Sequence, residues 1–289
     1  MVVGRGGQLS RALSASDPNL VILGRDQIDL EDAAGAEAAI IDTAPDIVVN
    51  AAAYTAVDKA ESDRARAYRV NAEGAAALAR GAAAVGAAFL HVSTDYVFDG
   101  TKSGEWTETD PTCPINVYGA SKLAGEHGAL AVNARTMILR TSWVYSPYGG
   151  NFVKAMLRLS DRERLSVVAD QHGKPTSALD LAAAILSVAP RLARAGDESV
   201  VWGIWHYAGR GTTNWAAFAD AVFTRAMGRL IDRRPVISAI ATTDYPTPAR
   251  RPHNSALDCS AFERMFSIDT VPWESGVDRV IDLLEECAT

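Results

Sequence analysis

The chain opens with MVVGRGGQLS (residues 1–10), a short apolar stretch, then a glycine-rich turn, then the start of a helical pattern. We expect a strand over residues 2–3 and a turn over residues 4–7 that leaves backbone N–H groups free at a helix N-terminus. Such an N-terminus binds anions, and in βαβ units it holds the pyrophosphate of a dinucleotide. The strict GxGxxG spacing fails because Leu9 takes the third glycine position, so this turn needs support from its surroundings.

The pattern that follows supplies this support, because short apolar runs alternate with Ala-rich helical stretches. Strands are predicted over residues 2–3, 20–23, 47–49, 89–92 and 137–139, and helices over residues 8–15, 32–43, 64–85 and 118–132. Runs that are apolar at successive positions are typical of strands covered on both faces. The alternation therefore predicts an α/β fold with a doubly wound parallel sheet.

The chain becomes less regular after about residue 145, where loops rich in Pro, Gly and aromatic residues begin. Helices are expected over residues 152–159, 179–188, 214–227 and 274–286. Thr212 or Thr213 is the expected N-cap of the third of these. We interpret residues 1–145 as a nucleotide-binding domain and residues 146–289 as a smaller, C-terminal α/β lobe that binds the substrate, with some later segments returning to the first domain.

Composition excludes several classes of protein. The 289 residues include 28 Lys and Arg and 35 Asp and Glu, for a net charge of −7, and the basic residues are scattered. The sequence therefore shows no basic patch of the kind that binds nucleic acid. The longest uncharged stretch, residues 81–94, is too short to span a bilayer, and no signal peptide is recognised. Three scattered cysteines fit a reducing cytoplasm better than a disulfide framework. We expect no nucleic-acid or membrane partner.

The end of the second predicted strand bears on the choice of cofactor. Dinucleotide sites that prefer NAD place an acidic residue there, which binds the ribose hydroxyls and repels a 2′-phosphate. Here Leu23 is followed by Gly24 and Arg25, so NADPH is slightly favoured over NADH. A solvated turn arginine explains Arg25 about equally well. Asp29 and Leu30 are expected to flank the adenine.

The strongest chemical signal is Tyr118-Gly119-Ala120-Ser121-Lys122, at the start of a predicted helix. A spacing of four places the phenol and the ammonium on one helix face. A nearby cation favours the phenolate, so Lys122 would tune Tyr118 for acid–base catalysis. Thr94 follows the fourth predicted strand, at the sheet edge where such folds bind ligands, and its hydroxyl can bind a reacting carbonyl oxygen.

A hydroxyl after strand four, followed by YxxxK, resembles the extended branch of the short-chain dehydrogenase/reductase superfamily. Longer strings, at residues 50–61, 93–100, 140–145 and 250–255, are similar to the dTDP-4-dehydrorhamnose reductase family, in its order and over nearly the whole chain. The resemblance implies a Rossmann-type domain with a smaller sugar-nucleotide lobe. It also implies NAD(P)H-dependent reduction of the C4 ketone of dTDP-4-dehydro-β-L-rhamnose to dTDP-L-rhamnose.

Residue roles follow from the glycine turn, the YxxxK pattern and this resemblance. Catalysis is assigned to Thr94, which binds the oxygen, Tyr118, which protonates it, and Lys122. Cofactor binding is expected at Gly4, Gly6, Gly7, Gln8, Leu9, Arg25, Asp29, Leu30, Ala51, Ala52, Ala53, Tyr54, Asn71, Tyr118 and Lys122. Substrate binding is expected at Val57, Thr94, Asp95, Tyr96, Trp143, Gln171, Arg250, Arg251 and Asn254.

Some of these substrate assignments have a plainer alternative. Trp143 would by default be a packing aromatic, and the resemblance moves it into the sugar pocket. Arg250 and Arg251 could be surface charges, but two guanidinium groups beside Pro252 suit a diphosphate. His91 and His206 lie in apolar runs and are expected in the core.

Two alternative functions remain. Another extended-branch sugar-nucleotide reductase or epimerase would share the motifs, whereas a dehydratase is disfavoured because Tyr96 stands where similar dehydratases have Glu. A non-catalytic NADP-binding regulatory subunit could share the fold, but the catalytic trio is intact.

The sequence also bears on assembly and on the start of the chain. Some members of the family dimerise around Mg²⁺ held by glutamates, and Ala12 occupies one such position, next to Arg11. We therefore expect no metal, and a monomer or weak homodimer. Because only three residues precede Gly4, we expect the natural start to lie upstream of Met1.

Overall fold

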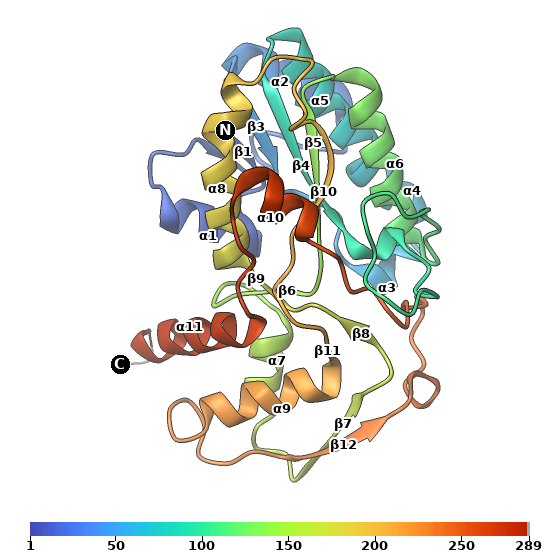
Figure 1. Ribbon diagram of the computed structural model, residues 1–289, viewed down its shortest axis with the longest axis vertical. Helices are drawn as coiled ribbons and strands as arrows, with labels where there is room; N and C mark the ends of the chain where they lie inside the picture. The colour runs from blue at the N-terminus through green and yellow to red at the C-terminus, as the bar shows by residue number, and fades with distance from the viewer. Residues whose placement is uncertain (288–289) are drawn as a thin grey trace.

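The computed structural model describes residues 1–287, and its centre is a six-stranded parallel sheet of order β10-β5-β4-β3-β1-β2 (Figure 1). The strands are β1 (Val2–Val3), β2 (Ile22–Leu23), β3 (Ile47–Asn50), β4 (Ala88–Thr94), β5 (Thr136–Thr141) and β10 (Gly203–His206). All five strands expected in the first half are confirmed, and β4 and β5 are longer than expected. Thr94 is consequently the last residue of β4.

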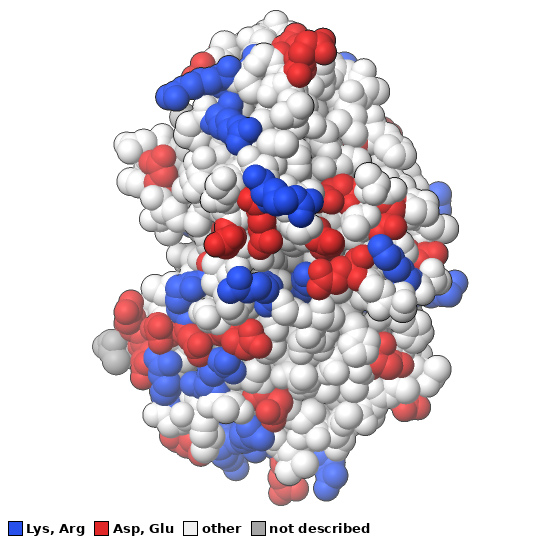
Figure 2. All heavy atoms as spheres, viewed as in Figure 1, with Lys and Arg blue, Asp and Glu red and all other residues white. Residues whose placement is uncertain are grey.

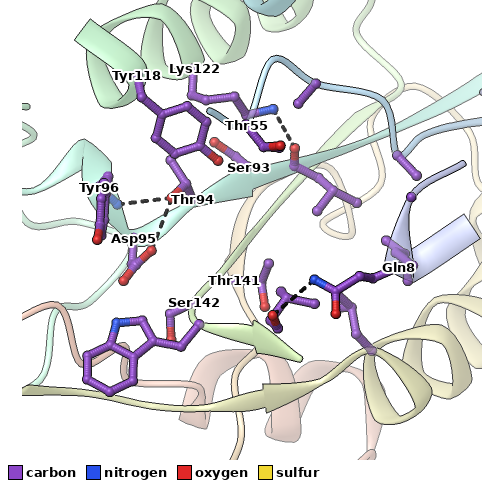
Figure 3. Close-up of a pocket in the computed structure, with 18 of the residues that line it drawn as sticks. Gln8, Thr55, Ser93, Thr94, Asp95, Tyr96, Tyr118, Lys122, Thr141 and Ser142 are labelled. Atoms are coloured by element: carbon purple, nitrogen blue, oxygen red, sulfur yellow. Dashed lines mark hydrogen bonds between the residues drawn. The ribbon is translucent and has the colours of Figure 1, made fainter. Parts of the chain in front are cut away.

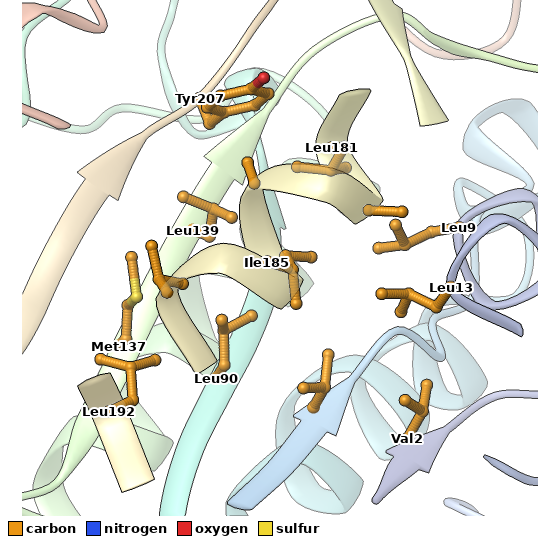
Figure 4. Close-up of a cluster of buried hydrophobic side chains, with 14 of the residues drawn as sticks. Val2, Leu9, Leu13, Leu90, Met137, Leu139, Leu181, Ile185, Leu192 and Tyr207 are labelled. Carbon is orange, nitrogen blue, oxygen red and sulfur yellow. The ribbon is translucent and has the colours of Figure 1, made fainter. Parts of the chain in front are cut away.

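Helices cover both faces of the sheet, which confirms the doubly wound prediction. On one face α1 (Gln8–Ser16) and α8 (Ala178–Arg194) pack on Val2, Leu90 and Leu139 (Figure 4). On the other face α2 (Ala33–Thr43), α5 (Ala75–Ala84) and α6 (Val117–Val132) lie over Val3, Phe89 and Ile138. Consecutive strand residues point to opposite faces, so two neighbouring apolar residues serve two cores.

The helix predicted over residues 64–85 is interrupted. It consists of α4 (Arg64–Tyr68), a π-helical turn over Arg69–Gly74 and then α5. Asn71 lies in this turn, where its side-chain oxygen accepts from the Tyr54 backbone N–H (2.8 Å) and its amide donates to the Ser121 hydroxyl (2.9 Å). The π turn therefore joins the segment after β3 to helix α6.

The second half contains a smaller lobe with its own core, formed by α7 (Phe152–Arg158), α9 (Trp215–Ala226) and α11 (Trp273–Glu286). Its strands pair in twos: β7 (Arg164–Val168) with β12 (Val236–Ile240), β8 (His172–Gly173) with β11 (Thr213–Asn214), and β6 (Val144–Tyr145) with β9 (Thr176–Ser177). Short helices lie at α3 (Val57–Ala60), α10 (Ser260–Phe266), Asp95–Val97 and Thr242–Asp244.

Two details differ from the sequence predictions. The N-cap of α9 is Asn214, and the prediction of Thr212 or Thr213 was wrong, because the helix begins at Trp215 and the Asn214 side chain accepts from the Ala217 N–H (2.9 Å). Helix α8 continues to Arg194, six residues beyond its predicted end, and includes Pro190.

Helix α8 packs on the central sheet and β10 is an edge strand of that sheet, although both follow residue 146. The division at residue 145 stays a prediction, and residues 288–289 of the second range lie outside the described residues. Among residues 1–287, no helix is long and apolar enough to cross a membrane. His91 and His206 are fully buried, as expected.

Candidate active site

The carboxyl ends of the central strands and the small lobe enclose a cavity of about 450 Å³ (Figure 3). Its walls come from the glycine turn, the segments after β3, β4 and β5, helix α6 and the first residue of α9. The predicted site residues that line it are Gly6, Gly7, Gln8, Leu9, Ala51, Ala52, Ala53, Val57, Thr94, Asp95, Tyr96, Tyr118, Lys122 and Trp143.

The glycine turn has the geometry of an anion-binding turn. Gly4 has φ +114°, and a Cβ there would lie 3.0 Å from the Ala52 nitrogen. Gly7 is the N-cap of α1, with no side chain capping the free N–H groups, and the space around Gly6 is open. The turn thus leaves the positive end of α1 facing the cavity.

A second cavity of about 330 Å³ continues from the first past Gly6, Gly7 and the alanines after β3. Predicted residues on its walls are Gly4, Arg25, Asp29, Leu30 and Tyr54. The two cavities share walls on either side of the glycine turn, so together they form a groove with the shape and the donors that a dinucleotide requires.

Arg25 is not free at the outer end of this groove. It pairs with Asp29 (3.3 Å) and with Glu31, and Arg66 pairs with Glu31 from the other side (2.8 Å). The Glu31 backbone N–H and Arg25 hold the pKa of Asp29 below its ordinary value, and Arg66 and Arg25 do the same for the pKa of Glu31. Carboxylates therefore do line this end of the groove, and sequence analysis missed Glu31 and Arg66.

The predicted catalytic hydroxyls lie together at the end of β4. Thr94 Oγ1 donates to Asp95 Oδ1 (3.0 Å) and accepts from the Tyr96 N–H (3.2 Å), and the Tyr118 hydroxyl interacts with it. Burial raises the pKa of Tyr118 to about 12 and that of Asp95 to about 7. Ser255 also interacts with the Asp95 carboxyl group, while Asp95 Oδ2 is buried and receives no hydrogen bond of good geometry from residues 1–287. The Tyr118 hydroxyl and the Asp95 carboxyl group thus lie next to the Thr94 hydroxyl (Figure 3).

Lys122 projects from α6 one turn after Tyr118, as the spacing predicted. Its Nζ donates to the Val92 carbonyl (2.7 Å) and lies 3.1 Å from His91 Nε2. Only 2% of the side chain is exposed, and burial lowers the pKa of Lys122 to about 8. A buried lysine with a lowered pKa is the kind of group found at functional sites.

Close backbone packing fixes the position of α6. Its N-cap Asn116 accepts from the Gly119 N–H (2.8 Å). A Cβ on Gly119 would collide with the Tyr96 carbonyl, and one on Gly125 would collide with the Asn71 carbonyl. The helix that carries Tyr118 and Lys122 therefore touches its neighbours through backbone atoms.

The opposite wall of the cavity is aromatic. Trp143, at φ +47°, stacks on Trp215 with ring centroids 3.6 Å apart and planes within 8°. Trp215 donates to Gln171 Oε1 (3.2 Å), which places the predicted residue Gln171 behind this pair. Sequence analysis missed Trp215, since a tryptophan at a helix start has no signal that separates it from a core residue.

The remaining predicted substrate residues divide into two groups. Arg251 is held by both Asp58 oxygens (2.8 and 3.0 Å) and lines a third cavity of about 410 Å³, which Trp215 and Gln171 also line. Arg250 and Asn254 do not line any of these three cavities. The Asn254 amide is occupied by the Lys102 and Gly104 carbonyls. Asn71 is buried behind Tyr54 and supports the groove without lining it.

Extended short-chain dehydrogenases/reductases combine a Rossmann sheet, a YxxxK helix and a second lobe over the strand ends, and fold and site place the chain in this class. The family model for the RmlD substrate binding domain matches residues 1–286. A dTDP-4-dehydrorhamnose reductase from Sinorhizobium fredii is 47% identical over 97% of this chain and 95% of that relative. The chain belongs to the dTDP-4-dehydrorhamnose reductase family.

Solved structures agree with this assignment. A dTDP-4-dehydrorhamnose reductase from Clostridium acetobutylicum superposes with a TM-score of 0.89, at 34% identity and with 98% of each chain covered. The reductase from Bacillus anthracis, solved in complex with NADP, gives the same TM-score at 33% identity, again over 98% of each chain. The resemblance found in the sequence motifs is confirmed.

Proposed function

We propose that this protein reduces the C4 ketone of dTDP-4-dehydro-β-L-rhamnose to give dTDP-L-rhamnose, with NADPH or NADH as the reductant. The observation that carries the proposal is the meeting of Thr94 and Tyr118 in a cavity that is continuous with the dinucleotide groove. The NADP complex of the Bacillus anthracis relative supports the choice of cofactor.

The chain's own residues suit each part of this reaction. The Gly6 and Gly7 N–H groups at the start of α1 would hold the pyrophosphate, and the nicotinamide, when bound, supplies the hydride. The Thr94 hydroxyl would bind the C4 oxygen as negative charge develops. Tyr118, whose raised pKa keeps its phenol protonated at neutral pH, would then supply the proton.

The small lobe would hold the sugar nucleotide. The Trp143 indole would cover the sugar ring, and Asp95 and Tyr96 would contact it from the short helix after β4. Arg251, held in place by Asp58, would reach the diphosphate, while the third cavity leaves room for the nucleoside beyond it. Roles for Arg250 and Asn254 would require the loop that carries them to move.

The test follows NADPH oxidation by the purified protein with dTDP-4-dehydrorhamnose, with dTDP-glucose as the control that lacks a ketone. We expect oxidation only with the ketosugar, and one dTDP-L-rhamnose formed for each NADPH consumed, as identified by NMR. Absence of oxidation at saturating concentrations of both ligands would overturn the proposal.

We also infer a monomer or weak homodimer that needs no metal, in a reducing cytoplasm. Ala12 is buried in the core, and Asp282 and Glu285 contact Arg229. Among residues 1–287, no group of three His, Cys, Asp or Glu side chains is placed to hold a metal ion. The three cysteines are unpaired, which supports the reducing compartment.

A further inference from the structure

A line of buried polar groups runs from the cofactor groove to Lys122. Asn50 ends β3, and His91 is its register partner on β4. Asn50 Nδ2 lies 3.0 Å from His91 Nδ1, and His91 Nε2 lies 3.1 Å from Lys122 Nζ. Asn50 and His91 are 1% and 0% exposed, so water does not replace either contact. Phe89 stacks on the imidazole with planes within 14°.

The backbone determines which way the Asn50 amide faces. The Ala52 N–H donates to Asn50 Oδ1 (3.1 Å), so the atom facing His91 is the amide nitrogen, which is a donor. His91 Nδ1 must therefore accept. Burial lowers the pKa of His91 well below its ordinary value, so the ring is neutral and has one N–H. That proton is on Nε2 and points at Lys122.

An ammonium group has no lone pair with which to accept this proton. The contact between His91 and Lys122 is a hydrogen bond only when Lys122 is a neutral amine, which donates to the Val92 carbonyl and accepts from His91. Burial lowers the pKa of Lys122 to about 8, so the neutral amine becomes the main form just above neutral pH.

Other titratable groups around Lys122 do not reverse this conclusion. Glu126, one turn further along α6, favours the ammonium, but it is bound by Arg140 from β5 (2.7 Å) and by the Ser93 hydroxyl. Tyr118, on the same helix face, carries no charge at neutral pH because its pKa is raised. Asp95, directly after β4, interacts with Thr94 and Ser255.

We propose that Asn50 and His91 are positioning residues that favour the neutral amine form of Lys122 in the cofactor-free protein, and that cofactor binding is accompanied by proton uptake at Lys122. The second half rests on the proposed function. Asn50 also accepts from the backbone N–H of Ala52, which lines both cavities of the groove. The Asn50 side chain therefore contacts the cofactor-binding segment as well as His91, the first step of what we call the Asn50–His91–Lys122 relay. The proton comes from solvent, and the resulting ammonium is the form that stabilises a Tyr118 phenolate.

The first test reads the tautomer directly, without cofactor or substrate. The chain has five histidines, so ¹⁵N-histidine labelling gives a simple spectrum. We expect His91 to be neutral and protonated on Nε2 from pH 6 to pH 9. His206 is the internal control, because its Nδ1 faces the Trp106 carbonyl (3.0 Å) and must carry the proton there. His91 protonated on Nδ1, or titrating near pH 6.5, would overturn the proposal.

A matched pair of variants tests whether Asn50 determines the tautomer of His91. In Asn50→Asp, one carboxylate oxygen still accepts from the Ala52 N–H and the other accepts a hydrogen bond from Nδ1–H, so His91 should switch tautomer and offer the Nε2 lone pair to an ammonium. Asn214→Asp adds the same charge at the N-cap of α9 and should leave His91 unchanged. An unchanged tautomer in a folded Asn50→Asp protein would overturn the relay. His91→Gln identifies the resonance.

The second test measures proton uptake by calorimetry of NADPH binding at pH 8.5, in two buffers of different ionisation enthalpy. We expect uptake of a fraction of one proton by the wild type and by Asn214→Asp, and less by Asn50→Asp. Binding without uptake by the wild type would overturn the second half of the proposal. Absence of NADPH binding would instead contradict the proposed function, and the tautomer result would still decide the first half.

Discussion

The two ends of the dinucleotide groove hold charged groups in opposite surroundings. At the catalytic end Lys122 is 2% exposed and Asp95 is 3% exposed, and burial moves the pKa of each toward neutrality. At the outer end the Arg25 side chain is 63% exposed and shares two carboxylates. Exposed ion pairs are screened by salt and contribute little free energy, whereas changing a buried charged or polar group changes the free energy much more. Substitutions should therefore matter most at the buried end.

The largest effect is expected from Tyr118→Phe. The variant lacks only the hydroxyl that would protonate the C4 oxygen, so kcat should fall ~10²–10⁴-fold while NADPH binding is kept. Steady-state kinetics measure kcat, and fluorescence titration measures NADPH binding. Tyr207→Phe, at a buried tyrosine packed on Phe262, is the control for loss of a phenol. A variant with more than a tenth of wild-type kcat would mean that another group donates the proton.

The second expectation concerns Asp95 and pH. Its pKa rises from 3.8 to about 7 on folding, so the folded state binds a proton that the unfolded state has lost. The contribution to stability is complete below pH 4 and is lost as pH rises through 7. Relative to Asp95→Asn, the wild type should lose on the order of 4 kcal/mol of unfolding free energy between pH 4 and pH 7.

Urea unfolding of both proteins at intervals from pH 4 to pH 8 measures this difference. Groups common to the two proteins cancel, so a difference that does not change with pH would show that Asp95 is ionised normally and that the buried end is more polar than its geometry indicates.

A smaller effect is expected at the aromatic wall. Trp143→Ala should raise KM for the sugar nucleotide about tenfold, in line with the loss of one aromatic contact, and should leave NADPH binding unchanged. Trp202→Ala, at an indole bound to the Gly196 carbonyl away from the cavity, is the control. Unchanged sugar-nucleotide kinetics would assign Trp143 to packing against Trp215 alone.

At the outer end, Arg25→Ala should weaken NADPH binding by a few-fold and leave NADH unaffected. An unshared charge-assisted contact with the 2′-phosphate would be worth roughly tenfold to a hundredfold. Asp29 and Glu31 already occupy the guanidinium, so the effect should be smaller, and smaller still at high salt. A strong preference of the wild type for NADH would contradict this expectation.

The smallest expected effect is that of removing metal. Activity and mass by light scattering should be the same in EDTA and in millimolar Mg²⁺, because Ala12 offers no oxygen ligand and Arg11 opposes a cation. A dimer that forms only with Mg²⁺ and is needed for turnover would contradict this prediction.

Most of the sheet could be predicted because buried parallel strands are continuous apolar runs, as at Phe89–Val92. The catalytic trio could be predicted because a spacing of four and a position at a strand end are local properties. The pair β7 and β12 could not be predicted, since only Val167 of Arg164–Val168 is buried and the segment lacks a strong pattern. The cap of α9 was misassigned because three capping residues are consecutive there, and only the exact start of the helix, at Trp215, selects Asn214.

Contacts between residues that are distant in the sequence were also not predicted. His91 was expected in the core and is buried, but its contact with Lys122 depends on how α6 lies over β4. Trp215 meets Trp143 only once the small lobe has formed. The pairing of Arg25 with Glu31 depends on the path of a surface loop. Such contacts follow from tertiary packing, which no local pattern encodes.

The backbone contacts of α6 have a consequence for mutational tolerance. Gly119 and Gly125 have no side chain to lose and no predicted ligand, yet a single added methyl group at either must push the helix off the Tyr96 or Asn71 carbonyl. In a library of random variants screened for turnover, both positions should be as intolerant as Tyr118 itself. A thermal-shift screen of the same library would separate them, since Tyr118→Phe keeps its melting temperature and an alanine at either glycine lowers it.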